Sequence, residues 1–168
     1  SKKHTAEVTA PSKEDTYDGT EKSAGTELTG TTFKWKDQTY TIKGLTSANV
    51  TKTDAGEYAN KVNGTAKVLD AAGNDVTAQF KVTKKAGKLT IKTRQVTLTS
   101  ATASKPYDGT PLTNDTVTVG GQGFVEGQGA TYKVTGSQTV VGRSANEFSY
   151  KLTEGTNADN YNISTTEG

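Results

Sequence analysis

Few residues in this chain could carry out acid-base or nucleophilic catalysis. His4 is the one histidine among 168 residues, and the absence of cysteine excludes disulfides and thiolate chemistry. Histidine titrates near neutral pH, but so close to the start of the sequence we expect His4 to be a solvated bystander in a frayed segment. The Gly-x-Ser-x-Gly turn of serine hydrolases is absent. The sequence therefore predicts no catalytic residue and no enzyme.

Three other stretches have compositions that suit bound ions. The glycine-rich segment Gly120–Gly129 resembles a phosphate loop, but it matches neither the dinucleotide-binding nor the Walker pattern, and no helix is predicted after it. We expect a flexible turn region there. Asp70–Asp75 and Thr156–Asn162 bring carboxylates and amides together, as calcium sites do, without the spacing of an EF-hand. Asx turns account for both stretches, so no metal and no cofactor are predicted.

One tetrapeptide, Tyr-Asp-Gly-Thr, occurs twice, 90 positions apart. Its copies are Tyr17, Asp18, Gly19 and Thr20, and Tyr107, Asp108, Gly109 and Thr110. Asp-Gly favours a turn in which glycine takes a positive φ, threonine re-enters a strand, and tyrosine buries its ring while its hydroxyl stays hydrogen-bonded. This pattern indicates a structural role. The alternative is a Tyr/Asp pair that grips a ligand.

Trp35 and Tyr40 are the residues most suited to contact a sugar. Trp35 is the only tryptophan in the sequence, and an exposed indole ring offers a stacking face. Packing against a core or a sheet is the more common role of such a ring. Trp35 and Tyr40 are therefore hypothetical ligand contacts, with the acidic residues of nearby loops beside them.

Composition narrows the class of protein further. Lys and Arg number 20 against 18 Asp and Glu, with no long run of one sign, so nucleic acid is not an expected partner. No apolar run approaches the ~18 residues of a membrane span, and the first residues do not read as a signal peptide. Threonine makes up nearly a fifth of the chain and favours strands. We interpret the sequence as a fragment of a longer protein.

The flanks of the two motifs also align, which extends the duplication to whole domains. "EVTAPSKEDTYDGT" parallels "TLTSATASKPYDGT", and "GEYANKV" parallels "GRSANEFSYKL". Near the two ends, "FKVTKKAG" (Phe80–Gly87) parallels "YNISTTEG" (Tyr161–Gly168). The second copy has no counterpart of the "KLTIK" that follows Gly87. We therefore expect the last strand of the second domain to be truncated.

The boundary between the copies lies within "GKLTIKTRQVTLTS". Apolar residues there change from odd to even positions, and one strand cannot keep both sets on the same face. A strand should end near Thr93 and another should begin near Gln95. We predict two domains, 1–93 and 94–168, joined with almost no linker as a semi-rigid rod.

Short strands are predicted throughout, beginning at Phe33, Tyr40, Val117 and Phe148, and the pair Asn63-Gly64 is typical of a turn. No segment shows a sustained helical period of apolar residues. The predicted fold class is all-β, with two small Ig-like β-sandwich domains in tandem, end to end.

The second copy in particular resembles a known family. "VTLTSATASKPYDGTPLTN", "GFVEGQGATYKVTGSQTVVGRSANEFSYKL" and "NADNYNISTTEG" are similar to tandem MBG-type repeats of adhesin-like surface proteins from Gram-positive bacteria. The first copy is similar more loosely. The resemblance implies a non-catalytic, monomeric stalk module of an extracellular, cell-wall-anchored protein, whose partners are neighbouring repeats. A carbohydrate- or mucin-binding module is the alternative.

A stalk module without cysteine needs another source of stability. An intramolecular Lys-Asn amide bond is one hypothesis, since a buried acid and an unprotonated lysine in an apolar pocket would favour its formation.

Overall fold

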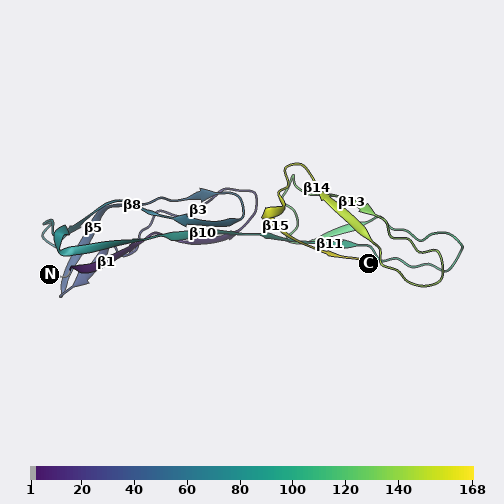
Figure 1. Ribbon diagram of the computed structural model, residues 1–168, viewed down its shortest axis with the longest axis horizontal. Helices are drawn as coiled ribbons and strands as arrows, with labels where there is room; N and C mark the ends of the chain where they lie inside the picture. The colour runs from purple at the N-terminus through teal and green to yellow at the C-terminus, as the bar shows by residue number, and fades with distance from the viewer. Residues whose placement is uncertain (1–2) are drawn as a thin grey trace. The chain divides into compact units, whose positions relative to one another are not determined.

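The computed structural model describes residues 3–168, and the regular structure in this part of the chain is almost entirely β-strand (Figure 1). Its helical segments are two three-residue 3₁₀ turns, η1 (Thr77–Gln79) and η2 (Ala158–Asn160). The prediction of an all-β protein is confirmed. Within the described residues, no helix has the length and apolar character needed to cross a membrane.

The chain divides into two compact units. Unit 1 contains the described residues up to Asp15 together with Thr20–Lys92. Unit 2 contains Thr93–Gly168 and, in addition, the four residues Thr16–Gly19. Most of the first Tyr-Asp-Gly-Thr motif therefore belongs to unit 2, although the sequence places it in the first repeat.

The strands of the first repeat form several small sheets. β1 pairs with β9 in parallel, β5 lies between β4 and β8, β10 lies between β2 and β7, and β3 pairs with β6. Their bounds are β1 (His4–Thr9), β2 (Lys13–Thr16), β3 (Lys22–Ser23), β4 (Thr32–Trp35), β5 (Gln38–Ser47), β6 (Thr51–Lys52), β7 (Gly56–Asn60), β8 (Val62–Leu69), β9 (Phe80–Lys85) and β10 (Gly87–Lys92).

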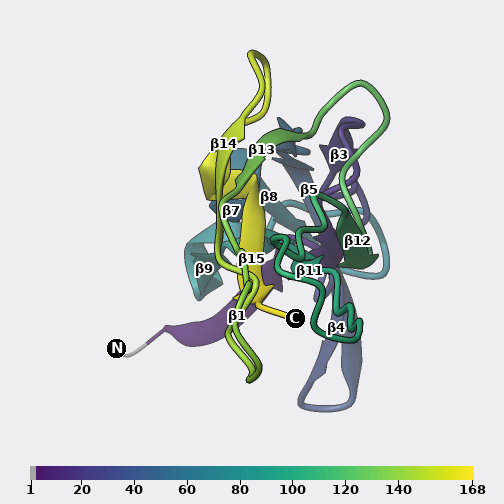
Figure 2. The ribbon, with the colours of Figure 1, turned by 90° about the vertical axis from the view of Figure 1, so that its right-hand side faces the viewer.

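The second repeat has fewer strands. They are β11 (Arg94–Ser100), β12 (Val117–Gly121), β13 (Ala130–Val134), β14 (Phe148–Leu152) and β15 (Tyr161–Thr166). Figure 2 shows β11 between β15 and β12, and β13 pairs with β14. β11 runs parallel to β15 with Arg94 opposite Tyr161, as β1 runs parallel to β9 with His4 opposite Phe80. The two repeats therefore share this parallel strand pair.

The predicted change of strand between Thr93 and Gln95 is confirmed. β10 ends at Lys92 and β11 begins at Arg94. Leu89 and Ile91 are buried from β10, and Val96 and Leu98 are buried from β11. The change from odd to even apolar positions thus marks the end of a strand that is buried in unit 1 and the start of a strand that is buried in unit 2.

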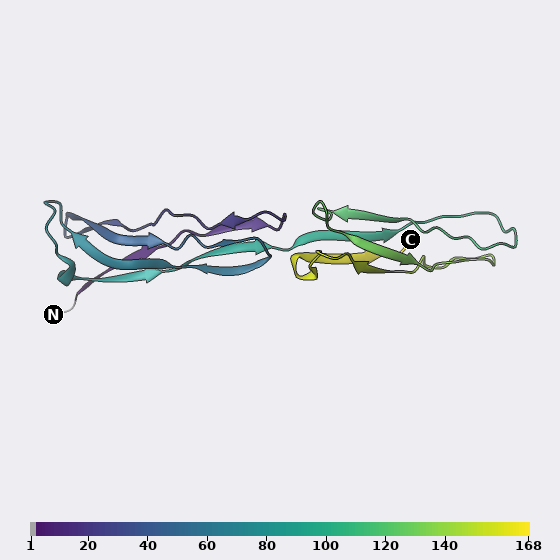
Figure 3. The ribbon, with the colours of Figure 1, turned by 90° about the horizontal axis from the view of Figure 1, so that it is seen from above.

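The two repeats differ most in the segments after β11 and after β13. Residues 101–116 and 135–147 contain no strand and run as long loops (Figure 3). They are connected by the bridge between Leu112 and Gln138 and by hydrogen bonds from the Asn146 side chain to the carbonyls of Ala101 and Asn114. The corresponding segments of the first repeat contain β2, β3, β6 and β7. Unit 2 accordingly has less regular structure than unit 1.

The prediction of a turn at Asn63-Gly64 is wrong, because both residues lie inside β8. The pairing of β5 with β8 shifts register between Lys43 and Leu45, which marks a β-bulge. Gly44 and Gly64 have φ values of +87° and +103° at this point. A Cβ on Gly64 would lie 2.1 Å from the carbonyl oxygen of Gly44. Glycine with positive φ serves a bulge here rather than a turn.

We expect Gly64→Ala to destabilise unit 1 more than Gly73→Ala. Both glycines have positive φ, so both variants carry the left-handed strain of about 1–2 kcal/mol. Only Gly64 also adds a steric overlap, since a Cβ on Gly73 meets nothing within 4 Å. Urea unfolding followed by the fluorescence of Trp35, which lies in unit 1, measures the difference. Equal losses in the two variants would contradict the role assigned to the bulge.

Candidate functional site

The tyrosine of the first motif is a core residue of unit 2. Tyr17 is 4% exposed, and its ring meets the ring of Tyr161 edge-on, with centroids 5.6 Å apart. The side-chain amide of Gln128 donates a hydrogen bond of 2.8 Å to the Tyr17 hydroxyl. Tyr17 thus has both properties expected of a buried tyrosine, a packed ring and a paired hydroxyl.

Tyr161 connects Tyr17 to the rest of unit 2. Its hydroxyl donates to Oε1 of Gln128 and accepts a 3.1 Å hydrogen bond from the backbone N–H of Val125. The ring of Phe124 lies 5.2 Å from that of Tyr161. Burial raises the pKa of the Tyr161 hydroxyl. We call Tyr17, Phe124, Val125, Gln128 and Tyr161 the tyrosine cluster.

The glycine-rich segment Gly120–Gly129 supplies three members of this cluster. Its path is fixed by Arg94, whose Nε and Nη2 donate to the carbonyl oxygens of Gly123 and Gln122 at 2.7 and 2.8 Å. The segment forms turns, as predicted, but those turns are held by hydrogen bonds and carry residues that cover Tyr161. The segment therefore has a structural role as a cap over Tyr161.

Close packing against Val125 explains why the first motif has a glycine at position 19. Gly19 has a φ of +79°, and a Cβ at this position would lie 2.9 Å from a methyl carbon of Val125. Gly109 has a nearly identical φ of +77°, but a Cβ there would meet only the Tyr107 hydroxyl, at 3.9 Å. Both motifs therefore form the same turn, and only the first is packed against a neighbouring segment.

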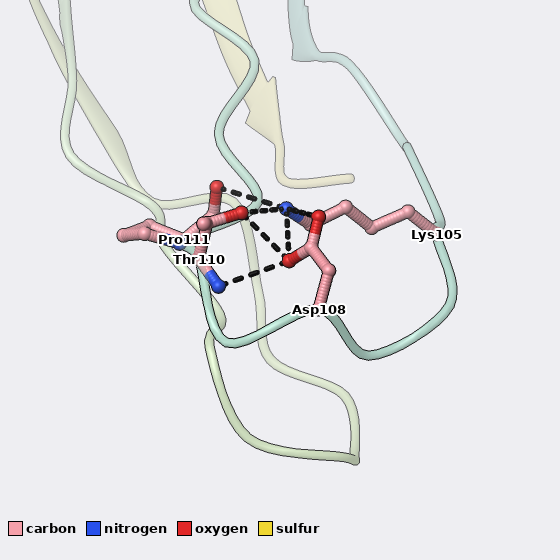
Figure 4. Close-up of polar contacts among 4 residues, drawn as sticks. All are labelled: Lys105, Asp108, Thr110 and Pro111. Carbon is pink, nitrogen blue, oxygen red and sulfur yellow. Dashed lines mark hydrogen bonds and ion pairs between the residues drawn. The ribbon is translucent and has the colours of Figure 1, made fainter.

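The second motif forms an exposed, self-contained hydrogen-bond network (Figure 4). Oδ1 of Asp108 accepts from the backbone N–H of Thr110 at 2.9 Å and from the Thr110 hydroxyl at 2.6 Å. Nζ of Lys105 lies 2.9 Å from the same carboxylate and also donates to Thr110 Oγ1 at 2.6 Å and to the Pro111 carbonyl at 3.4 Å. The Thr110 hydroxyl, followed by Lys105, lowers the pKa of Asp108 well below its ordinary range.

Tyr107 stands apart from this network. Its side chain is 66% exposed, whereas Tyr17 is almost fully buried. The tyrosine of the motif is thus buried in one copy and exposed in the other, whereas its Asp, Gly and Thr are exposed in both.

Trp35 and Tyr40, the hypothetical sugar contacts, lie in an aromatic group of unit 1. Tyr40 is buried, and Trp35 packs half-buried against the same core. The ring of His4 stacks on Trp35, with centroids 5.2 Å apart and an angle of 23°, and Phe80 meets Trp35 edge-on at 5.4 Å. Nζ of Lys36 lies 4.6 Å from the centroid of the Trp35 ring. Much of the indole is therefore occupied by the protein's own side chains.

The prediction that His4 is a solvated residue in a frayed segment is wrong. His4 is the first residue of β1, opposite Phe80 in β9, and it is half-buried. Parallel pairing with β9 and stacking on Trp35 hold it in place. A terminal position was a poor guide because the strand pairs from its first residue.

Unit 2 contains a groove of about 660 Å³, within the range of about 300–1,000 Å³ typical of ligand pockets. Its walls are the loops that lack strands, within residues 101–114 and 136–146, together with Gly168. Tyr107, Val140 and Val141 line it with exposed fractions of 66%, 70% and 86%.

The two carboxylate-rich loops are closed by their own hydrogen bonds. Asp70 accepts from the backbone of Ala72 and Asn74, and the Asn74 N–H is the main reason that the pKa of Asp70 is lowered. Asn157 accepts from the backbone N–H of Asp159 at the start of η2. The predicted Asx turns are confirmed. Among residues 3–168, no group of three or more His, Asp or Glu side chains is placed to hold a metal ion.

The buried amide of unit 1 is engaged by partners other than lysine. The side chain of Asn60 donates to the Pro11 carbonyl and the Ser47 hydroxyl, and it accepts from the backbone N–H of Val50. The hypothesis of a Lys-Asn amide bond stays a prediction.

Comparison with known proteins identified no similar protein. No protein-family model, no curated protein and no solved structure matches this chain.

We expect Asp108 to titrate well below the ordinary value of about 3.9, and Thr110→Val to raise its pKa. A lowered pKa in the folded state means that the carboxylate stabilises the turn above the unfolded-state pKa, and that this contribution is lost as pH falls through the folded pKa. Thr110→Ser keeps the hydroxyl donor and should keep the low value. The NMR chemical shift of the Asp108 carboxyl carbon, followed between pH 7 and pH 2, measures this titration in the unmodified protein and in both variants. Titration of all three proteins near 3.9 would contradict the network.

Proposed function

We propose that this chain is a pair of non-catalytic structural repeats from the stalk of an extracellular, cell-wall-anchored, adhesin-like surface protein of a Gram-positive bacterium. In this proposal its partners are neighbouring repeats, and it spaces a distal binding region from the cell wall. Each repeat would be a small Ig-like β-sandwich. The observation that carries the proposal is the burial of Tyr17, a residue of the first repeat, within unit 2.

A residue shared in this way suits an array of serial repeats. In repeat proteins, stability is the sum of each repeat's own stability and of terms between neighbours. Tyr17 contributes an aromatic contact and a buried hydroxyl to a unit whose own sequence provides few buried apolar side chains. Unit 2 is thus most stable when the first repeat precedes it, as a stalk of serial repeats requires.

A glycan-binding module remains the second candidate, because Trp35 is half-buried rather than fully buried. One part of its ring is still open to solvent, and Lys36 lies beside it. The stacking of His4 on Trp35 argues against a sugar on that face.

We expect Tyr17→Ala to destabilise unit 2 strongly and Tyr107→Ala to leave it nearly unchanged. Truncation of a buried aromatic residue costs about 3–5 kcal/mol, whereas an exposed substitution costs within about 0.5 kcal/mol. Amide exchange in β11 reports the stability of unit 2, and Trp35 fluorescence serves as the control for unit 1. In single-molecule pulling, one of the unfolding events should move to lower force in Tyr17→Ala alone.

Tyr17→Phe separates the ring from the hydroxyl. It removes the hydrogen bond from Gln128 and should cost about 1 kcal/mol. If Tyr17→Ala and Tyr107→Ala lower the stability of unit 2 equally, the burial of Tyr17 does not set the stability of unit 2, and the proposal fails.

For the second candidate, we expect the fluorescence of Trp35 to stay constant when mucin-type glycans are added. The ring is already packed against His4 and Phe80. A saturable shift that disappears in Trp35→Phe would instead support glycan binding.

A further inference from the structure

The groove of unit 2 lies where unit 1 contains a strand. On one side, "GRSAN" (Gly142–Asn146) corresponds to β7, "GEYAN" (Gly56–Asn60). Gly56 and Gly142 have φ values of +156° and +149°. The side-chain amide of Asn60 donates to the Pro11 carbonyl at 2.9 Å, and that of Asn146 donates to the Ala101 carbonyl at 3.0 Å. This edge of the groove is therefore built as in unit 1.

The other edge corresponds equally well. The pairing of Lys22 with Lys52 in β3 and β6 is matched by the bridge between Leu112 and Gln138. Residues 103–106 take the place of β2, directly before the Tyr-Asp-Gly-Thr motif. The frame around the groove thus repeats the frame around β10.

Gly168 occupies the position of Gly87, the first residue of β10. A Cβ on Gly87 would lie 2.1 and 2.5 Å from the carbonyl oxygens of Pro11 and Ala10. A Cβ on Gly168 would lie 2.5 Å from the carbonyl oxygens of both Ala101 and Ser100. The Gly168 carbonyl also accepts a 2.7 Å hydrogen bond from the Asn146 N–H. Gly168 therefore lies at the entrance of the groove.

In unit 1 the space beyond this glycine is filled. β10 pairs with β2 on one side and with β7 on the other, and it buries Leu89 and Ile91 almost completely. In unit 2 the equivalent walls contain no strand, and Val140, Val141 and Tyr107 are exposed at the groove. Unit 2 therefore has the walls of this site without the central strand between them.

We propose that the groove of unit 2 is a β-strand acceptor site. Its occupant is an extended segment continuing the polypeptide from Gly168, with apolar residues at the second and fourth positions after the glycine, as in β10. This segment pairs with residues 101–107 on one side and with Gly142–Asn146 on the other. The inference rests on the proposed function, because it describes how consecutive segments of a repeat array complete one another.

The segment that fits the groove should differ from β10 in the charge of its first residue. In unit 1, Nζ of Lys88 lies 3.5 Å from the carboxylate of Glu57. Arg143 takes the place of Glu57 in unit 2. A basic residue directly after the glycine would therefore face Arg143, whereas an acidic residue would pair with it. The matched strand carries Asp or Glu at that position.

The test compares three five-residue extensions of the full chain after Gly168. Glu-Leu-Thr-Ile-Lys is the matched strand, Glu-Ser-Thr-Ser-Lys removes the apolar residues, and Lys-Leu-Thr-Ile-Lys reverses the charge beside Arg143. Hydrogen exchange of residues 101–107 and 142–146 is the readout. The matched strand should slow exchange at least about tenfold, since it buries two branched side chains. The serine version should have no effect, and the lysine version should protect less at low salt.

A fourth arm adds the matched peptide in trans to the 168-residue chain. It should protect weakly, because a short covalent connection corresponds to an effective concentration in the millimolar range. Equal exchange in the matched and serine extensions would overturn the proposal. Micromolar protection by the free peptide with none from the extension would assign the groove to a separate chain and would also overturn it.

These outcomes are distinguishable from failure of the proposed function. Tyr17→Ala changes the tyrosine cluster, none of whose residues lines the groove. Tyr107, the site of its control variant, does line the groove, so the two proposals are separated by the effect of Tyr17→Ala itself. Protection by the extension without an effect of Tyr17→Ala would reject the shared-residue account and retain the acceptor site.

Discussion

Burial of the Tyr17 ring against Tyr161, with its hydroxyl paired to Gln128, is the interaction on which the structure of unit 2 depends most. Among the described residues, unit 1 has eleven buried hydrophobic side chains and unit 2 has four, which are Tyr17, Val96, Leu98 and Tyr161. Because aromatic side chains each bury about 150–250 Å², Tyr17 makes up a large part of this small core. A residue of the first repeat is therefore part of the hydrophobic core of the second unit.

The second constraint is the need of backbone N–H and C=O groups for partners. The strand framework β12–β11–β15 satisfies them at one end of unit 2, and long loops surround the groove at the other. Segments that form strands in unit 1 stay irregular in unit 2 where no counterpart of β10 lies between them. Regular structure in these repeats is therefore set by neighbouring strands more than by local sequence.

Sequence reasoning predicted features with a local physical cause. The shift from odd to even apolar positions located the end of β10, and Asp-Gly identified both motif turns. It misjudged Asn63-Gly64, because positive φ suits a bulge as well as a turn. It did not find Gln128 or distinguish Tyr17 from Tyr107, because their environments depend on contacts between distant positions, and identical tetrapeptides carry no information about those contacts.

The central claim is that Tyr17 is part of the core of unit 2, and nuclear Overhauser spectroscopy of the full chain tests it most directly. The account predicts cross-peaks between the ring protons of Tyr17 and Tyr161, and between Tyr17 and the side-chain amide of Gln128, while Tyr107 shows shifts close to those of an exposed tyrosine. Equivalent, solvent-like shifts for Tyr17 and Tyr107, with no cross-peak from Tyr17 to Tyr161, would contradict it.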